Sequence, residues 1–393
     1  MPVALLTEPT PANRGSREPA SPPDALDAGF AARVTANYPL TGARSSAEKR
    51  HVEVDLMGSD LDYQPGDALA ILPRNDPQVV EALLDCLGIA GGMPVADGAA
   101  ETSLTDALTR RFEIGVASPR FLKHWAALSG SQQLRALTKP EATDARRDFL
   151  HAHHVIDIVR AFPVGGLAAE TLVAGLRPLQ PRLYSFASSP AETPGRAAIT
   201  TSTLVYELHG ALRRGVVSGF QVPAASPGTS LPVRVEPQDF RLPADDAAII
   251  MVGAGTGVAP FGAFVGERRA RGASGRSWLV MGARTARDDF IYRGDWEAAL
   301  ADGYLDRLDL AFSRDAAEKI YVQDRLREYG ATVFAWLEDG ASLCVCGDAA
   351  GMGPGVHAAL LEIIAVHGGY SHEEAMAYLR RLAREHRYQR SIY

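Results

Sequence analysis

Apolar and polar residues alternate over two short segments in the first fifth of the chain. Residues 50–56 read Arg-His-Val-Glu-Val-Asp-Leu, and an apolar run at residues 68–72 follows a Pro-Gly turn. A period of two sends successive side chains to opposite faces, so both segments are predicted to be β-strands. We interpret them as strands of a β-barrel.

The apolar period becomes helical after residue 74. Asp76-Pro77 is suited to cap and begin a helix. The apolar positions that follow have helical spacing: Val79, Val80, Leu83, Leu84 and Leu87. Strand patterns return only at Arg182. The pattern therefore predicts that a helical insert, residues 75–177, interrupts the barrel.

The last part of the chain alternates strands and helices. The predicted strands are Ala247–Val252, Trp278–Met281, Leu308–Phe312 and Ser342–Cys346. Such alternation is typical of an α/β doubly wound parallel sheet. We therefore predict a barrel in residues 30–74 and 178–243 and an α/β domain in residues 244–393. Residues 1–29, rich in Pro, Ala, Ser and Glu, are expected to be a disordered leader.

Composition narrows the function and the compartment. The 393 residues carry a formal net charge of −7 and no long basic run, which argues against nucleic acid as a partner. No run approaches 18 apolar residues, so no membrane span is expected. Three cysteines and no signal peptide predict a reduced, cytoplasmic protein.

The octapeptide Arg-Leu-Tyr-Ser-Phe-Ala-Ser-Ser, residues 182–189, suits a flavin diphosphate. An extended chain sends Arg182 and Tyr184 to one face and Leu183 and Ser185 to the other. The guanidinium can pair with a pyrophosphate, the ring can cover an isoalloxazine face, and Ser185 can hydrogen-bond near the ring edge. The alternative is an exposed strand edge.

Two later segments suit a nicotinamide dinucleotide. Residues 253–260, Gly-Ala-Gly-Thr-Gly-Val-Ala-Pro, follow an apolar strand and precede a helix, which is a phosphate-cradling arrangement. Val258 replaces the third glycine of the plain dinucleotide fingerprint, so a tight turn remains the alternative. Ser313 and Arg314 end a strand, with Lys319 soon after. These residues suit a 2′-phosphate and hence NADP, whereas ordinary solvated charges are the alternative.

Together these motifs resemble the reductase half of the diflavin reductases, which join an FAD domain to an NADP domain of the ferredoxin–NADP reductase type. The motifs RLYSFASS, GAGTGVAP, AFSRD, KIYVQ, CVCGDA and RYQRSIY carry the resemblance, from about residue 31 to residue 393. QPGDALAILPRNDP and YRGDWEAAL are similar to the NADPH-sulfite reductase flavoprotein branch of that family. The resemblance implies that the helical insert is a connecting domain.

The resemblance also implies roles for individual residues. It assigns to FAD the residues Arg182, Leu183, Tyr184, Ser185, Thr200, Thr201, Ser202, Tyr206, Gly215, Val216, Val217 and Ser218. It assigns to NADPH the residues Gly255, Thr256, Gly257, Ser313, Arg314, Lys319, Ile320, Tyr321, Val322 and Gln323. The implied catalytic residues are Ser185, Cys346 beside the nicotinamide, and Tyr393, which covers the flavin and moves aside. A simple turn at 215–218 and a frayed C-terminus are the alternatives.

Two departures from the family pattern concern hydride transfer. Ser391 stands where the family usually has an acidic residue two positions before the terminal aromatic. Pro354-Gly355 replaces the acidic residue expected after the CGDA motif. Both departures put the rate of hydride transfer in question more than cofactor binding.

The resemblance implies an enzyme that passes electrons from NADPH through FAD to a partner. The family places a flavodoxin-like FMN domain before the barrel, and here only a short leader precedes it. We therefore expect a separate FMN-containing chain or another electron carrier, with a hemoprotein sulfite reductase subunit as a possible partner. A ferredoxin/flavodoxin–NADP reductase and a non-catalytic flavin-binding docking subunit are the alternative functions.

A metal site is not expected. Cys344 and Cys346 point the same way on a strand, but no second pair completes four ligands. His151, His153 and His154 are distant in sequence from the flavin motifs, and we expect a surface or packing role for them.

Overall fold

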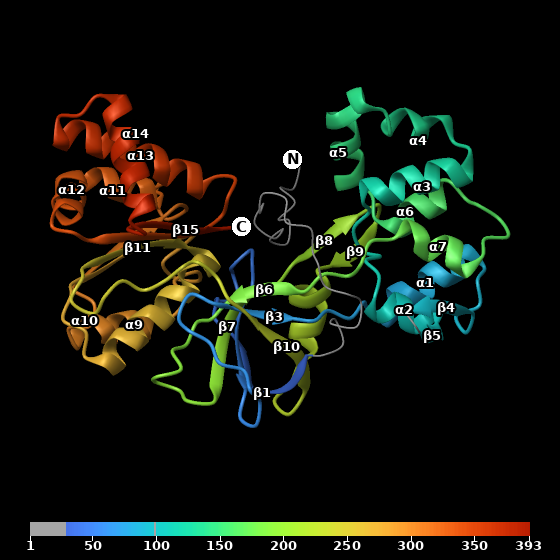
Figure 1. Ribbon diagram of the computed structural model, residues 1–393, viewed down its shortest axis with the longest axis horizontal. Coiled ribbons are helices and arrows are strands. Elements are labelled where there is room, and N and C mark those ends of the chain that lie inside the picture. The colour runs from blue at the N-terminus through green and yellow to red at the C-terminus, as the bar shows by residue number, and fades with distance from the viewer. Residues whose placement is uncertain (1–28, 98–99) are drawn as a thin grey trace.

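The computed structural model describes residues 29–97 and 100–393. The predicted leader, residues 1–29, lies outside the described residues apart from Gly29. Three bodies lie in a row, with a central β-sheet body between a helical body and an α/β unit that ends the chain (Figure 1). In the described residues, no helix combines the length and apolarity needed to cross a lipid bilayer.

Six antiparallel strands form the central body, in the order β6-β3-β10-β1-β2-β7. They are β1 (Phe30–Pro39), β2 (Lys49–Asp55), β3 (Ala68–Ile71), β6 (Arg182–Ser185), β7 (Arg196–Ser202) and β10 (Ser230–Glu236). A bridge between Phe186 and Ile199 links the two outer strands, so the sheet closes into the predicted barrel. Val52 and Val54 on β2 are buried in its core, as the alternating pattern predicts.

The helical body lies between β3 and β6 in the chain and has its own apolar core. Its elements are α1 (Pro77–Leu87), β4 (Pro94–Asp97), β5 (Ala100–Ser103), α2 (Leu104–Arg110), α3 (Pro119–Ser129), α4 (Gln132–Leu137), η2 (Pro140–Ala142), α5 (Thr143–His151), α6 (Val155–Ala161) and α7 (Ala169–Gly175). Asp76 caps α1 as predicted, because its carboxylate accepts a hydrogen bond from the Gln78 amide and Pro77 begins the helix. Fully buried Phe121 and Trp125 stack within the core, with ring centroids 5.5 Å apart.

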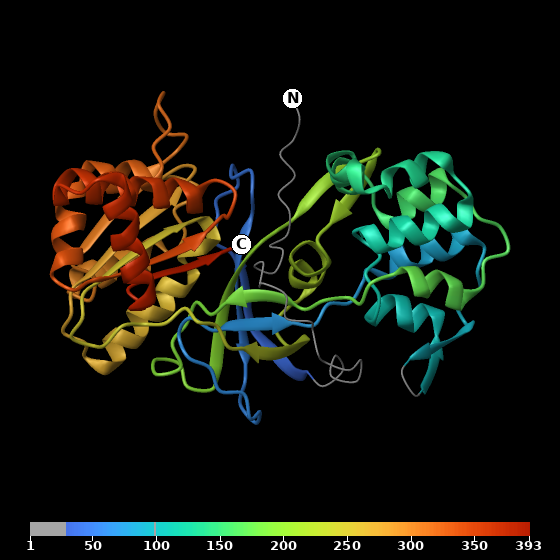
Figure 2. The same ribbon diagram turned by 45° about the horizontal axis from the view of Figure 1, so that its top comes forward.

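A hairpin that the sequence pattern does not predict reaches from the barrel toward the helical body (Figure 2). Its strands are β8 (Val205–Leu208) and β9 (Ala211–Arg214). Both strands are short and largely exposed, so they lack the alternating apolar signal of a half-buried strand. The chain then forms the π-helix η3 (Val216–Gln221) and the short helix α8 (Val222–Ala224).

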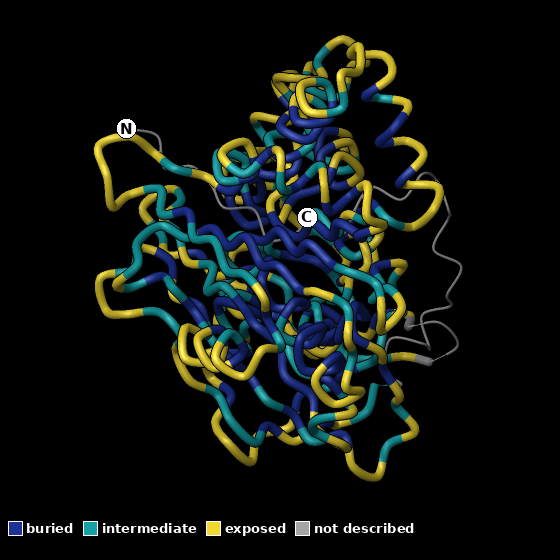
Figure 3. Tube along the Cα trace, turned by 90° about the vertical axis from the view of Figure 1, so that its left-hand side faces the viewer, coloured by how far each residue is buried: buried dark blue, intermediate teal, exposed yellow. Residues whose placement is uncertain are grey.

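Five parallel strands form the second sheet, in the order β13-β12-β11-β14-β15. They are β11 (Ile249–Ala254), β12 (Ser277–Ala283), β13 (Arg307–Phe312), β14 (Ser342–Gly347) and β15 (Tyr388–Ile392). The helices are η4 (Gly255–Val258), α9 (Ala259–Arg271), α10 (Arg293–Ala301), α11 (Val322–Glu328), α12 (Gly330–Glu338), α13 (Met352–Gly368) and α14 (His372–Arg384). Side chains of α9 and α10 pack in one core cluster and those of α11 to α14 in another. Figure 3 shows the buried strands between these layers, which confirms the doubly wound fold.

The edge strand β15 was missed from sequence. It carries Gln, Arg and Ser within five residues, so it lacks the apolar run that marks a buried strand. β15 pairs with β14 and places Ser391 opposite Cys346. The C-terminus therefore lies at the sheet and between the barrel and the α/β unit (Figure 1).

Candidate functional site

Arg182, at the start of β6, is held by a buried carboxylate of the helical body. Its Nη2 donates to Glu113 Oε2 at 2.9 Å, and its Nη1 donates to the Gln180 carbonyl at 2.6 Å. The Glu113 side chain is only 3% exposed, and its Oε1 accepts hydrogen bonds from the amides of Gly115 and Val116. The guanidinium is thus fixed at the junction of the barrel and the helical body.

The rest of β6 forms a partly open barrel edge. Leu183, Tyr184 and Ser185 are each only partly buried, and β6 pairs with β3 through Tyr184 opposite Leu69 and Ser185 opposite Ala68. An incompletely covered tyrosine beside a fixed guanidinium is an arrangement that a flat, charged ligand can use.

The predicted residues of β7 have differing environments. The Thr200 hydroxyl lies 2.7 Å from the Tyr292 hydroxyl, which in turn lies 2.8 Å from His51 Nδ1. Thr201 is fully buried, and its hydroxyl has no hydrogen-bond partner within the described chain. Ser202 ends the strand and is partly buried. Thr200 therefore joins the barrel to the α/β unit through Tyr292, a contact that the sequence did not reveal.

Tyr206, on β8, contacts the helical body. Its hydroxyl lies 2.6 Å from His154 Nε2. Burial lowers the pKa of His154 to about 4, so the imidazole is neutral at pH 7. We missed this contact because 52 residues separate the two positions.

Residues 215–218 begin a helical segment and not a simple turn. Val216, Val217 and Ser218 open η3, and the first amides of a helix have no acceptors within it. Gly219 lies so close to Leu204 that a Cβ would come within 2.2 Å of its carbonyl oxygen. The segment is therefore the tightly packed start of a short helical turn.

The glycine loop of the α/β unit packs against the carboxyl end of β14. Gly255 has a φ of +57°, which favours glycine. A Cβ on Gly257 would lie 2.2 Å from the Cys346 carbonyl oxygen. Thr256 lies between them, and α9 follows directly. Strand, loop and helix thus have the geometry of a phosphate cradle at the carboxyl edge of the sheet.

Cys346 is fully buried at the end of β14 beside this loop. Burial raises the pKa of its thiol to about 12, and a hydrogen bond with Ser391 works in the opposite direction. The thiol is therefore protonated at neutral pH. Among the described residues, no group of three or more His, Cys, Asp and Glu side chains is arranged to hold a metal ion.

Tyr393 is the last residue of the chain, and it is anchored at the sheet. Its amide donates to the Gly347 carbonyl at 3.1 Å, and its main-chain oxygen accepts from the Ala349 amide at 2.9 Å. Its hydroxyl lies 2.8 Å from the hydroxyl of Thr256 in the glycine loop. The residue keeps 36% of its surface exposed. A frayed end, the alternative considered from sequence, is therefore not what the structure has.

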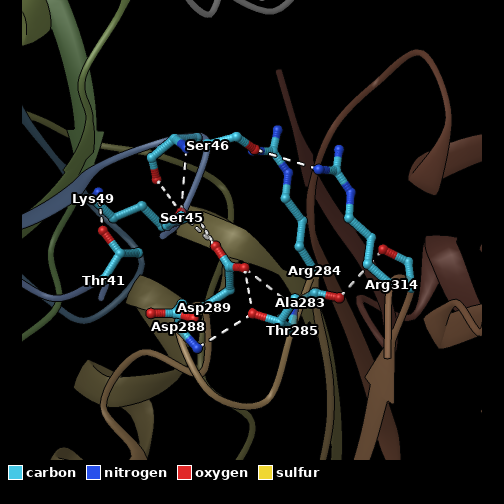
Figure 4. Close-up of polar contacts among 12 residues, drawn as sticks. Thr41, Ser45, Ser46, Lys49, Ala283, Arg284, Thr285, Asp288, Asp289 and Arg314 are labelled. Atoms are coloured by element: carbon cyan, nitrogen blue, oxygen red, sulfur yellow. Dashed lines mark hydrogen bonds and ion pairs between the residues drawn. The ribbon is translucent and has the colours of Figure 1, made fainter. Parts of the chain in front are cut away.

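Two arginines lie side by side at the carboxyl ends of β12 and β13 (Figure 4). Arg284 Nη1 and Arg314 Nη1 both donate to the Ser46 hydroxyl, at 2.5 and 3.4 Å. Within residues 29–97 and 100–393, neither forms an ion pair with a carboxylate. Burial and the charge of Arg314 both lower the pKa of Arg284. Adjacent guanidiniums without a carboxylate partner favour a bound anion.

Polar contacts beside these two arginines also join the barrel to the α/β unit. Lys49 Nζ lies 3.9 Å from Asp289, which also accepts a hydrogen bond from the Ser45 hydroxyl at 2.6 Å. Burial lowers the pKa of Lys49. The Lys49 side chain also lies against Gly255, 3.4 Å from where a Cβ would stand. Neither Arg284 nor Lys49 lies in a recognisable motif, so neither was predicted from the sequence as a site residue.

The other predicted dinucleotide residues that lie near Arg314 in the sequence differ in their exposure. Ser313 follows β13 directly and is partly buried, and Lys319 and Tyr321 are exposed. Ile320 is partly buried, whereas Val322 begins α11 and is buried in the core. The Gln323 side chain lies 3.1 Å from where a Cβ of Gly355 would stand. Val322 therefore packs as a core residue, and the polar residues remain accessible.

Family models match both halves of this arrangement. Residues 22–220 match the FAD binding domain family, and residues 251–358 match the oxidoreductase NAD-binding domain family. The chain thus belongs to the FAD-binding domain family and joins that domain to a nicotinamide dinucleotide-binding domain of the ferredoxin–NADP reductase type. Its class is that of flavoprotein oxidoreductases.

Three curated proteins similar to this chain share one name. The chain is 42% identical over 366 residues to the protein of Vibrio cholerae named sulfite reductase [NADPH] flavoprotein alpha-component. The aligned region covers 93% of this chain and 59% of that protein. Proteins of the same name from Salmonella paratyphi B and Neisseria meningitidis are 41% and 40% identical, covering 94% and 100% of this chain. The chain spans about three fifths of the length of the relatives it matches.

Proposed function

We propose that the chain is an NADPH-dependent FAD flavoprotein that accepts a hydride from NADPH and passes electrons to a partner carrier. The preference for NADPH over NADH rests on one observation: among the described residues, Arg284 and Arg314 lack a carboxylate partner. A 2′-phosphate would neutralise both guanidiniums, with Ser313 and Lys319 close by in the chain.

In this proposal, Arg182 and the helix that starts at Val216 hold the FAD pyrophosphate, and Tyr184 lies against the flavin. The bound flavin supplies hydride acceptance and one-electron release. Cys346 presents a neutral thiol beside the glycine loop and so adds no negative charge near the nicotinamide. Tyr393 occupies the entrance beside Thr256 and must move for the nicotinamide to enter.

We further propose that the chain serves as the flavoprotein component of assimilatory sulfite reduction, in which sulfite is reduced to sulfide. The identity of 40–42% to the relatives named above supports this role. The partner would be a hemoprotein sulfite reductase subunit, reached directly or through an FMN-containing carrier. Cys86, Cys344 and Cys346 are all free thiols, which suits the reducing cytoplasm.

The protein is expected to purify with FAD and without FMN. Only FAD has the pyrophosphate that Arg182 and the segment 215–218 would bind, and FMN lacks the adenylate half. The flavin is released by denaturation and compared with FAD and FMN standards by chromatography. Stoichiometric FMN would contradict the assignment of the barrel.

A further inference from the structure

Two side chains of the helical body form hydrogen bonds with two of the proposed FAD residues. Glu113 binds Arg182 at 2.9 Å across 69 residues of sequence, and His154 binds Tyr206 at 2.6 Å across 52 residues. Arg182 belongs to the barrel, and Tyr206 belongs to the hairpin that leaves it. Both contacts therefore cross from one body to the other.

Hydrogen bonds within the helical body hold Glu113 in place, in addition to its bond with Arg182. Its amide donates to the Arg177 carbonyl at 2.9 Å, and its Oε1 accepts from the amides of Gly115 and Val116 at 3.0 and 3.3 Å. Because the Glu113 side chain is only 3% exposed, it has little room to adopt another rotamer. Arg182 thus meets a carboxylate whose position the helical body sets.

His154 is held by a second buried group. Its amide donates to Asp157 Oδ2 at 2.9 Å, and Asp157 Oδ1 accepts from Arg213 Nη2 at 2.5 Å. His154, Asp157 and Arg213 are all buried. Because Tyr206 lies on β8 and Arg213 on β9, the helical body fixes both strands of the hairpin.

We propose that Glu113 and His154 are positioning residues for flavin binding, so that the helical body completes the FAD site and does not serve only as a spacer. The proposal rests on the proposed function, because Arg182 and Tyr206 are its FAD residues. Glu113 holds the Arg182 guanidinium where it can also receive a pyrophosphate, since a guanidinium has five N–H donors. His154 holds the Tyr206 ring against the helical body.

The test compares FAD affinity in the full chain for Glu113→Gln, Glu113→Leu, His154→Gln and His154→Leu. Glu170→Gln and His151→Gln are matched controls, because both positions are exposed on the same body. FAD dissociation constants are measured from the rise in flavin fluorescence on release. We expect about tenfold weaker binding for each Leu variant, from loss of a charged or buried hydrogen bond. The Gln variants should recover part of that loss, and the controls should match the parent chain.

Two further measurements separate positioning from folding. The visible circular dichroism of bound flavin should change in the Leu variants, because the flavin site loses a fixed partner, whereas a purely structural defect would lower only the unfolding temperature of the flavin-free chain. If a Leu variant does not fold, its Gln variant decides. NADP⁺ affinity should stay unchanged, since the α/β unit is untouched.

Equal FAD affinity and equal flavin dichroism in all variants would overturn the proposal. Tighter FAD binding by Glu113→Gln would also overturn it, because the carboxylate would then compete with the pyrophosphate for Arg182. Absence of FAD binding by the parent chain and both controls would instead refute the proposed function. The two failures are therefore distinguishable.

Discussion

Arg314→Ala should raise the KM for NADPH by roughly tenfold to a hundredfold and leave the use of NADH nearly unchanged. One charge-assisted hydrogen bond to a phosphate is worth about 1.5–3 kcal/mol, and each 1.4 kcal/mol corresponds to about tenfold. Only NADPH carries the 2′-phosphate that Arg314 would bind. Steady-state reduction of an artificial electron acceptor, with each nicotinamide varied in turn, gives both constants.

Arg380→Ala is the matched control for this prediction. Arg380 is an exposed arginine on α14, in the same α/β unit and away from the carboxyl ends of β12 and β13. Its substitution should change neither constant. Equal weakening of NADPH and NADH in Arg314→Ala would show that the arginine does not recognise the 2′-phosphate.

Removal of Tyr393 should improve NADH use more than NADPH use. In the proposed function the ring stacks on the flavin, which is worth about 0.5–1.5 kcal/mol, and its hydrogen bond with Thr256 adds about 1 kcal/mol. The nicotinamide must displace both, and NADPH offsets that cost partly through its 2′-phosphate. A chain ending at Ile392 should therefore show roughly a tenfold gain in kcat/KM for NADH, with tighter NADP⁺ binding and slower product release.

Tyr370→Ala provides the comparison for the shortened chain. Tyr370 is as exposed as Tyr393, at 37% against 36%, but lies beside α13 and α14. It should leave the NADPH-to-NADH ratio and the flavin absorbance unchanged. If the chain ending at Ile392 behaves in the same way, the terminal ring does not cover the flavin.

Residues that follow a periodic pattern were predictable from sequence. The alternation around Val52 and Val54 gives a barrel strand, and Asp76 followed by Pro77 gives the start of α1, because short-range chemistry decides both. The strand, glycine loop and helix around Gly257 follow for the same reason.

Contacts between bodies were not predictable in this way. Arg284, Lys49 and Tyr292 form contacts between the barrel and the α/β unit, and no local pattern in the sequence predicts those contacts. In the edge strand β15 only Tyr388 is buried, so the strand carries no apolar run or alternation that would predict it. The roles of individual cofactor residues remain predictions that the variants above test.

Hydride transfer from NADPH to bound FAD is the step on which the proposed function depends. The direct measurement is rapid anaerobic mixing of the purified, flavin-loaded protein with NADPH, followed through the visible flavin absorbance. We expect NADPH to bleach the flavin fully and NADH to do so far more slowly. A protein that binds FAD but keeps its colour under excess NADPH would instead be a flavin-binding docking subunit without turnover, and Ser391 opposite Cys346 would be the first position to examine.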